Sequence, residues 1–254
     1  MEMTSYAAGT PSWVDLSATD IKGACDFYGP LLGWTFEDQG PEFDHYTVAS
    51  LNGKSVAGIS PARASTPNAV WATFITVDDT ETTVKAVENA GGQQLGEIME
   101  IPSAGRMAVF KDVNGAEFCT WQPNAMIGAS LVNEPGALTW NELYASETQK
   151  ATTFYNAVFG WQPVARDFNS TEYTTYLLDD RGIAGMLPLQ GNAPEGMPSF
   201  WLTYFSVANA DESIEKIKEL GGVVKMGPMD IEIGRFAVAQ DAQGAGFAII
   251  QLAG

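Results

Sequence analysis

The 254-residue sequence predicts an α+β protein built from four similar modules, arranged as two consecutive pairs. The first observation is an internal repeat, because PSWVDLSATDIKGACDFYGPLLGW at 11–34 returns as LTWNELYASETQKATTFYNAVFGW at 138–161. The second is that strand-like alternation and helical spacing follow one another in the same order in every module. The third is a related pair of segments that begins at Trp71 and Trp201.

The first module begins with a strand, because residues 13–18 alternate between two faces with a period of two. A helix follows, with Asp20 as a good N-cap and Gly33 at its end. Residues 45–60 predict two more strands joined by an Asn-Gly turn, which is typical of a tight hairpin. The helix is predicted from its apolar residues at helical spacing, namely Ala24, Phe27, Tyr28 and Leu31.

The second module repeats this order, with a strand at 71–77, a helix at 80–90 and two strands within 106–122. The third and fourth modules match the first and second, so the organisation is A-B-A′-B′. The matching pairs include Trp13 and Trp140, Tyr28 and Tyr155, Trp34 and Trp161, Tyr46 and Tyr173, Gly58 and Gly185, Trp71 and Trp201, Arg106 and Arg235, and Asp112 and Asp241. A module of about 60 residues buries little apolar surface alone, so modules must pair face to face.

These pairs predict two domains, at residues 1–126 and 137–254, joined by a connection at 127–136. The connection, IGASLVNEPG, is short, and its Gly and Pro cluster only at its end. We therefore expect the two domains to pack against each other rather than to swing freely. Because four modules can complete two sheets within one chain, a monomer is favoured over a homodimer.

Composition restricts the classes of partner. Thirteen Lys and Arg stand against 31 Asp and Glu, which gives a net charge of −18 and disfavours binding to nucleic acid or to anionic membrane surfaces. The sequence has no signal-like start and no apolar run long enough to span a bilayer, and its two cysteines form no CxxC pair. We expect a soluble, unprocessed cytoplasmic protein.

Two stretches, DLSATDIKGACDFYGPLLGW and DVNGAEFCTWQP, resemble the opening and closing parts of modules in the vicinal oxygen chelate superfamily. This superfamily includes glyoxalases, bleomycin-resistance proteins and extradiol dioxygenases. The resemblance covers nearly the whole chain and implies βαβββ modules, two of which form a curved, mostly antiparallel eight-stranded sheet around a cavity. Here it implies two such glyoxalase-like domains in tandem.

Enzymes of this superfamily usually hold a divalent metal with a His on the first strand of a module and a Glu on the last. Carried over by register, these positions hold no His or carboxylate, and a lone cysteine is a poor metal site. We therefore expect neither a metal nor another cofactor. The six positions are Trp13, Ala72, Trp140, Leu202, Cys119 and Ala248.

The pattern Trp-x-acid occurs twice, as Trp13 with Asp15 and as Trp140 with Glu142. Strand residues two apart share a face, so each pair can form an aromatic wall beside a carboxylate that grips a planar ligand or acts as a general base. The structural alternative places the Trp in the core and pairs the carboxylate with an arginine. The further candidates for the ligand site are Phe74, Tyr204, Arg106 and Arg235.

The single histidine, His45, is a candidate acid or base because its ordinary pKa lies near neutrality, although a solvent-exposed loop position is the alternative. Cys119 is interpreted as a small buried residue. The differences between the halves, such as Asp15 against Glu142, suggest that one cavity is functional and the other filled.

The function that these observations favour is metal-independent binding of a hydrophobic or aromatic small molecule, for resistance by sequestration or for natural-product tailoring. One alternative is an enzyme, either a glyoxalase-like lyase or isomerase or a tailoring enzyme for aromatic polyketides, with Asp15, Glu142 or His45 as base. A second alternative is a structural or interaction protein in which both cavities are filled. One fold hosts many chemistries, so the resemblance does not choose among them.

Overall fold

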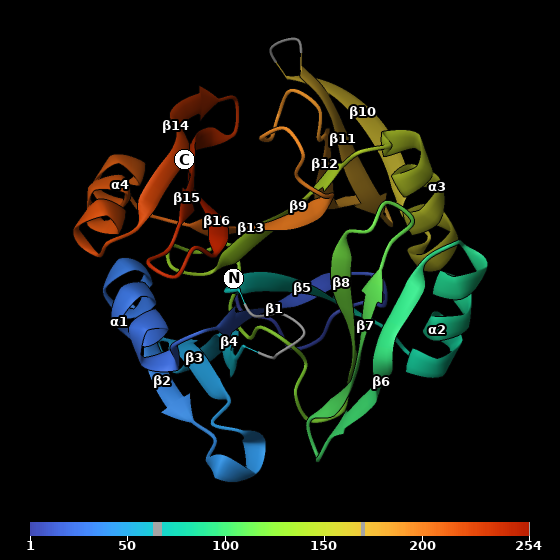
Figure 1. Cartoon of the computed structure of the whole chain (residues 1–254), viewed down its shortest axis with the longest axis horizontal. Helices are drawn as coiled ribbons and strands as arrows, with labels where there is room; N and C mark the ends of the chain where they lie inside the picture. The colour runs from blue at the N-terminus through green and yellow to red at the C-terminus, as the bar shows by residue number, and fades with distance from the viewer. Residues whose placement is uncertain (63–67, 169–170, 254) are drawn as a thin grey trace.

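The computed structural model describes residues 1–62, 68–168 and 171–253. It confirms an α+β fold with two curved eight-stranded sheets (Figure 1). The first sheet and its helices comprise β1 (Pro11–Ala18), α1 (Ile21–Leu32), β2 (Thr35–Asp38), β3 (Thr47–Leu51), β4 (Lys54–Pro61), β5 (Val70–Thr76), α2 (Thr80–Asn89), β6 (Gln93–Ile101), β7 (Gly105–Lys111) and β8 (Glu117–Pro123). The second comprises β9 (Leu138–Ala145), α3 (Thr148–Phe159), β10 (Gln162–Phe168), β11 (Thr171–Leu178), β12 (Arg181–Pro188), β13 (Phe200–Ser206), α4 (Ala210–Glu219), β14 (Val223–Ile231), β15 (Gly234–Gln240) and β16 (Gly246–Leu252).

Both sheets have the same topology, which confirms the βαβββ modules. The first has the strand order β2-β3-β4-β1-β5-β8-β7-β6, and the second has β10-β11-β12-β9-β13-β16-β15-β14. The first strands of the two modules in each sheet, β1 with β5 and β9 with β13, pair antiparallel at the centre. Each also pairs in parallel with the last strand of its own module. No helix in the described residues is long and apolar enough to cross a membrane.

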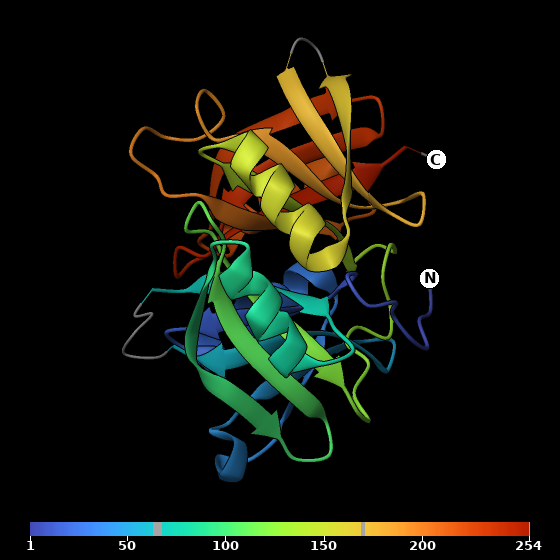
Figure 2. The same cartoon turned by 90° about the vertical axis from the view of Figure 1, so that its right-hand side faces the viewer.

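The two sheets lie back to back, with their concave faces turned away from each other (Figure 1). Helix α1 lies beside α4 on one side, and α2 lies beside α3 on the other (Figures 1 and 2). The apolar residues between the sheets form two clusters, each of which mixes residues from both halves. The halves therefore share one buried interior.

Residues that occur at matching positions in the two halves also join the halves together. The Tyr28 hydroxyl on α1 donates a hydrogen bond to Asp241 Oδ2 (3.0 Å) in the turn before β16, and it accepts one from Trp71 Nε1 (2.9 Å). The opposite side has an equivalent triad, consisting of Tyr155, Asp112 and Trp201. The recurrence of these residues in the sequence thus reflects contact between halves, a role that the sequence analysis did not assign.

The tryptophans that follow the first helix of each half also reach across. Trp34 Nε1 donates to the Gly136 carbonyl oxygen, and Trp161 Nε1 donates to that of Gly9, each at 2.7 Å. Both indoles are buried. The segment before each half's first strand is therefore anchored to the other half.

Two local predictions have different outcomes. The Asn52-Gly53 hairpin between β3 and β4 is confirmed, and both residues have positive φ. The predicted strand from His45, in contrast, begins only at Thr47, because Asp44 and His45 adopt left-handed backbone conformations after a short 3-10 turn.

Candidate functional site

The alternation of β1 and β9 divides their side chains between the shared interior and the outer surface of each sheet. Val14 and Leu16 enter the shared interior, so Trp13 and Asp15 point to the other side. We call these outer surfaces the first and second concave faces, for the first and second sheets. Trp140 and Glu142 take the corresponding places on the second.

The first concave face is filled by the protein's own residues. Trp13 and Phe74, opposite each other in register, are 4% and 6% exposed. They form a cluster with Ala129 and Val132 from the segment between the two sheets, and Met3 near the N-terminus packs against it. The cluster also contains Cys119 and Trp121. A planar ligand would have to displace these segments.

Hydroxyl groups hold the Asp15 carboxylate. Ser60 Oγ donates to Asp15 Oδ1 at 2.8 Å, and Tyr46 is also hydrogen-bonded to this carboxylate. Trp13 Nε1 donates to the Tyr46 hydroxyl at 3.2 Å. Burial, followed by the charge of Asp15, raises the pKa of Tyr46 well above its usual value, so this tyrosine stays protonated.

The second concave face has the same arrangement with more tyrosines. Trp140 Nε1 donates to the Tyr173 hydroxyl at 2.9 Å, and the Tyr204 hydroxyl donates to Glu142 Oε2 at 2.7 Å. Tyr173 and Tyr144 are also hydrogen-bonded to Glu142. Burial raises the pKa of the Glu142 carboxyl, and the three hydroxyls oppose this effect by stabilising the charged form.

One glycine on each face makes room for this network. A Cβ atom on Gly185 would collide with the Tyr173 hydroxyl, and one on Gly58 would collide with the Tyr46 hydroxyl. Each tyrosine hydroxyl therefore lies directly over a glycine of the neighbouring strand. This explains why both the tyrosine and the glycine recur at matching positions in the sequence.

Aromatic rings line the second concave face, and some remain partly exposed. Tyr144 and Phe200 stack with centroids 4.7 Å apart at an interplanar angle of 5°. Trp140 and Phe200 are only partly buried, whereas Trp13 is almost fully buried. The loop after β12 packs against the same cluster through Leu189 and lies within the curve of the sheet (Figure 1). This face thus keeps accessible aromatic surface beside a buried carboxylate.

Arg106 and Arg235 form ion pairs on the helix side of their sheets. Arg106 forms ion pairs with Glu81 of α2 and Glu100, and Arg235 forms ion pairs with Asp211 of α4 and an aspartate on β14. Strand alternation is the reason: the neighbouring Met107 packs on the first concave face, so Arg106 points to the helix side. Neither arginine lies with the aromatic ligand-site candidates; within the described residues, Asp15 accepts a hydrogen bond from Ser60 and Glu142 accepts one from Tyr204.

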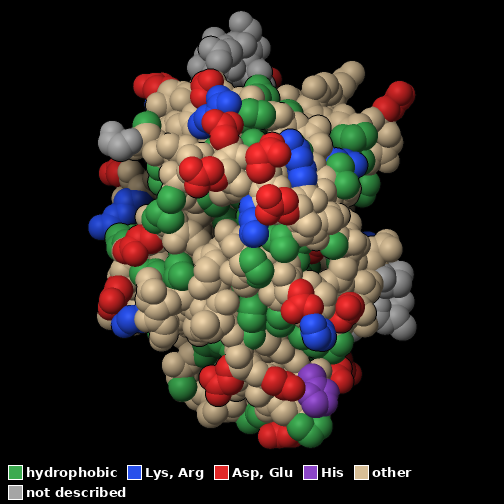
Figure 3. Space-filling model, turned by 90° about the vertical axis from the view of Figure 1, so that its left-hand side faces the viewer, with side chains coloured by type: hydrophobic (Ala, Val, Ile, Leu, Met, Phe, Trp, Pro, Cys, Tyr) green, Lys and Arg blue, Asp and Glu red, His purple; other side chains and the backbone are tan. Residues whose placement is uncertain are grey.

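His45 lies at the surface of the molecule (purple in Figure 3). Its Nδ1 is 2.9 Å from Asp38 Oδ2, and its side chain is 58% exposed. The hydrogen bond and the charge of Asp38 raise the pKa of His45. The same view shows acidic side chains spread over the surface, with fewer basic ones between them. The loop-edge alternative for His45 therefore agrees with its position.

The residues at the family's metal positions do not fit a chelated divalent ion. In the first sheet these positions hold Trp13, Ala72 and Cys119, and in the second they hold Trp140, Leu202 and Ala248. Across residues 1–62, 68–168 and 171–253, no three His, Cys, Asp or Glu side chains come together as a metal site. Indole and alkyl groups offer no donor for such an ion, and the Cys119 thiol is a single soft donor.

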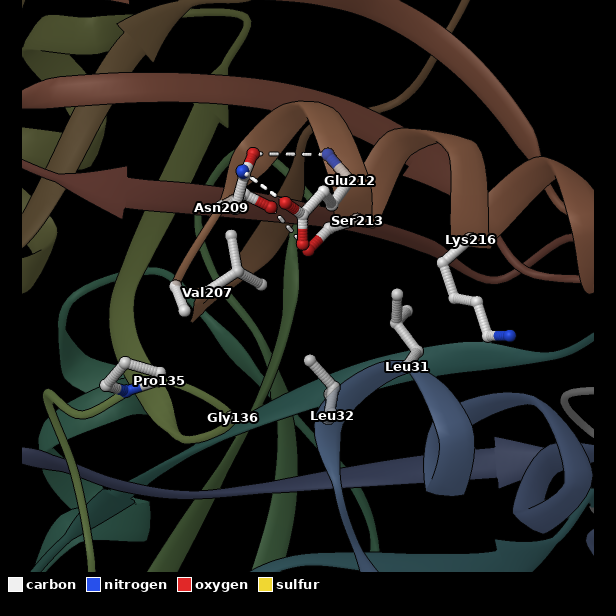
Figure 4. Close-up of a pocket in the computed structure, with 10 residues that line it drawn as sticks. Leu31, Leu32, Pro135, Gly136, Val207, Asn209, Glu212, Ser213 and Lys216 are labelled. Carbon is white, nitrogen blue, oxygen red and sulfur yellow. Dashed lines mark hydrogen bonds between the residues drawn. The ribbon is translucent and has the colours of Figure 1, made fainter.

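A separate groove lies at the junction of the two halves, between α1 and α4 (Figure 4). Its volume is about 350 Å³, and its floor includes Leu31, Leu32 and Val207. The Asn209 side chain at its edge accepts hydrogen bonds from two backbone N–H groups and so caps α4. No local pattern in the sequence indicates this groove, because its walls come from both halves.

Comparisons with known proteins agree with this architecture. A family model described as the Glyoxalase/Bleomycin resistance protein/Dioxygenase superfamily matches residues 137–249, and one described as a Glyoxalase-like domain matches residues 13–121. The chain is 38% identical to CFP32 of Mycobacterium tuberculosis, which is named only provisionally as a glyoxylase, over 98% of this chain and 97% of that protein. It is 33% identical to the anthracycline biosynthesis protein DauV of Streptomyces sp. (strain C5), over 98% of this chain and 96% of that protein.

Among solved structures, the 2,3-dioxygenase LapB from Pseudomonas sp. KL28 superposes with a TM-score of 0.65. The two chains are 14% identical, and the match covers 98% of this chain and 93% of that chain. At this level of identity the likeness concerns the fold alone. The tandem arrangement of two curved sheets is thus common to both proteins.

Proposed function

Because this chain belongs to the glyoxalase, bleomycin resistance protein and dioxygenase superfamily, we propose that it binds a planar aromatic small molecule on its second concave face, without a metal ion. One observation carries the proposal: Trp140 stays partly exposed beside Tyr144 and Phe200, whereas its counterpart Trp13 is covered by the chain itself. Flat aromatic walls with a few fixed polar groups are typical of small-molecule sites.

The biological role of this binding is inferred from the relatives rather than from the fold, so we infer only the class of role. DauV is named as an anthracycline biosynthesis protein and matches nearly the whole of this chain. This supports a role in natural-product tailoring, or in holding such a product, over a purely structural role. The donor sets described above support binding through aromatic contact instead of chelation.

The binding proposal is tested by titrating the protein with planar aromatic compounds while intrinsic tryptophan fluorescence is recorded. We expect saturable quenching that is lost in Trp140→Phe and retained in Trp13→Phe, the matched variant on the other sheet. We also expect the same affinity in the presence of a chelator. Quenching that survives Trp140→Phe, or that requires an added divalent ion, would overturn the proposal.

A second candidate function is catalysis with Glu142 as the general base. It is favoured by the burial of this carboxylate, which raises its pKa toward the range useful for proton transfer, and by its position beside the aromatic wall. An enzyme of this kind would lose turnover in Glu142→Gln while it still bound its substrate. Unchanged turnover of a confirmed substrate in that variant would exclude this mechanism.

A further inference from the structure

Glu142 is a buried carboxylate without a basic partner in the part of the chain that the structure describes. The residue is 4% exposed, and none of the ion pairs between described residues includes it. A buried charge is costly unless it is compensated. A cation bound on the second concave face would therefore complement this carboxylate.

The neighbours of Glu142 stabilise its charged form but do not neutralise it. The Tyr204 hydroxyl donates at 2.7 Å, and Tyr173, itself fixed by Trp140 Nε1, is hydrogen-bonded to the same carboxylate. Hydroxyl donors hold the carboxylate in place and favour its ionised state without adding positive charge. The arrangement holds the carboxylate in position beneath the aromatic surface, and a bound cation would favour its ionised form.

The rings around this carboxylate have the second property that a cation site needs. Indole and phenol faces attract ammonium groups, most strongly where water is excluded. Trp140 and Phe200 are two partly exposed rings of this face, and Tyr144 stacks on Phe200. A ligand that lies on these rings would have its positive group near Glu142.

The first concave face lacks this combination. Phe74 stands in place of Tyr204 and Ser17 in place of Tyr144, so two of the three phenol groups are missing. The remaining surface is covered by the protein's own chain. Asp15 is therefore a natural control, since it is a buried carboxylate of the same fold position without the open aromatic surface.

On the basis of the proposed binding function, we infer that the ligand of the second concave face is a planar aromatic cation. Its protonated amine or quaternary ammonium group would lie against the rings of Trp140 and Phe200 and be attracted by Glu142. This assigns a charge class to the ligand, which neither the fold nor the relatives specify.

The test compares three tricyclic probes of similar size that differ in charge near neutral pH: proflavine (cationic), acridine (neutral) and an acridine carboxylate (anionic). Titrations are run at high salt, because the net charge of −18 attracts any cation and salt screens that general effect. We expect proflavine to bind about tenfold or more tightly than acridine, and the anion to bind most weakly.

Three variants test which residue causes the preference for the cationic probe. Glu142→Gln should abolish it, whereas Asp15→Asn and Asp44→Asn should keep it; Asp44 is exposed, so its replacement removes one charge without touching either face. A preference that survives Glu142→Gln, or that is lost in Asp44→Asn, would overturn the inference. If Glu142→Gln fails to fold, the unaltered protein decides, since equal affinity for proflavine and the anionic probe would overturn it.

The two proposals fail in different ways. Binding of all three probes with similar affinity, dependent on Trp140, would leave the proposed function in place and reject the charge assignment. Absence of Trp140-dependent binding for every probe would reject both.

Discussion

The hydrogen bonds that join the two halves give a sharp prediction for Tyr155→Phe. The substitution keeps the aromatic ring and removes only the hydroxyl, which accepts from Trp201 Nε1 at 3.0 Å and donates to Asp112 Oδ2 at 3.1 Å. All three side chains are buried. The change therefore acts on hydrogen bonding across the interface, with little change in packed volume.

The magnitude follows from what remains unsatisfied. The indole N–H loses its acceptor, and a buried unsatisfied donor costs about 1–3 kcal/mol. Asp112 loses one donor but keeps the backbone N–H groups of Asn114 (2.8 Å) and Ala116 (2.9 Å) on Oδ1. Together these effects should lower the free energy of unfolding by about 2–4 kcal/mol. Tyr28→Phe, its counterpart in the first module, should have a similar effect.

The assay is urea unfolding followed by both circular dichroism and tryptophan fluorescence. Tyr176→Phe is the control, because this buried hydroxyl donates to Met186 Sδ within its own half. We expect the control to lose less stability than Tyr155→Phe. Because Tyr28 and Tyr155 belong to separate triads, their effects should add in the double variant. A Tyr155→Phe protein no less stable than the control would refute the reasoning.

Three other predictions concern single side chains. Gly185→Ala should lower stability by about 1–3 kcal/mol through overpacking against the Tyr173 hydroxyl, and Tyr173→Phe in the same chain should recover part of it, as thermal unfolding would reveal. Burial raises the pKa of Glu142 in the folded protein above its usual 4.5. Between the unfolded and folded pKa values the folded protein keeps a proton on Glu142 that the unfolded chain has released, so the free energy of unfolding should fall as pH rises through this range. The slope should be smaller in Glu142→Gln. Arg106→Gln should leave both the melting temperature and ligand binding nearly unchanged, because its partners lie on the helix side; a loss of binding would contradict that placement.

The order of elements was predictable because the residues of each module show strand and helix periodicity, and the same periodicity recurs in the second half of the chain. The strand patterns that begin at Trp71 and Trp201 and the Asn52-Gly53 turn are local signals. Local signals determine strands, helices and hairpins. The aromatic and acidic candidates on β1 and β9 were placed on one face for the same reason.

Contacts between distant segments were not predictable from such patterns. Asp112 and Tyr155 recur with their counterparts, but nothing in the repeat says that the partner of each lies in the other half. Arg106 pairs with Glu81 while Ser60 donates to Asp15, because charged residues on different strands can point to opposite sides of a sheet. The filling of the first concave face depends on Ala129, which lies far along the chain.

The contacts of Tyr28 with Asp241 and of Tyr155 with Asp112 have a consequence for the origin of the chain. Each half contains both a tyrosine of this kind and an aspartate of this kind, so a single half carries two complementary surfaces and would associate with an identical copy about a two-fold axis. Fusion of two such copies makes their association independent of concentration. It also allows the two copies to diverge in sequence, so that one concave face can be covered by its own residues while the other keeps partly exposed aromatic rings.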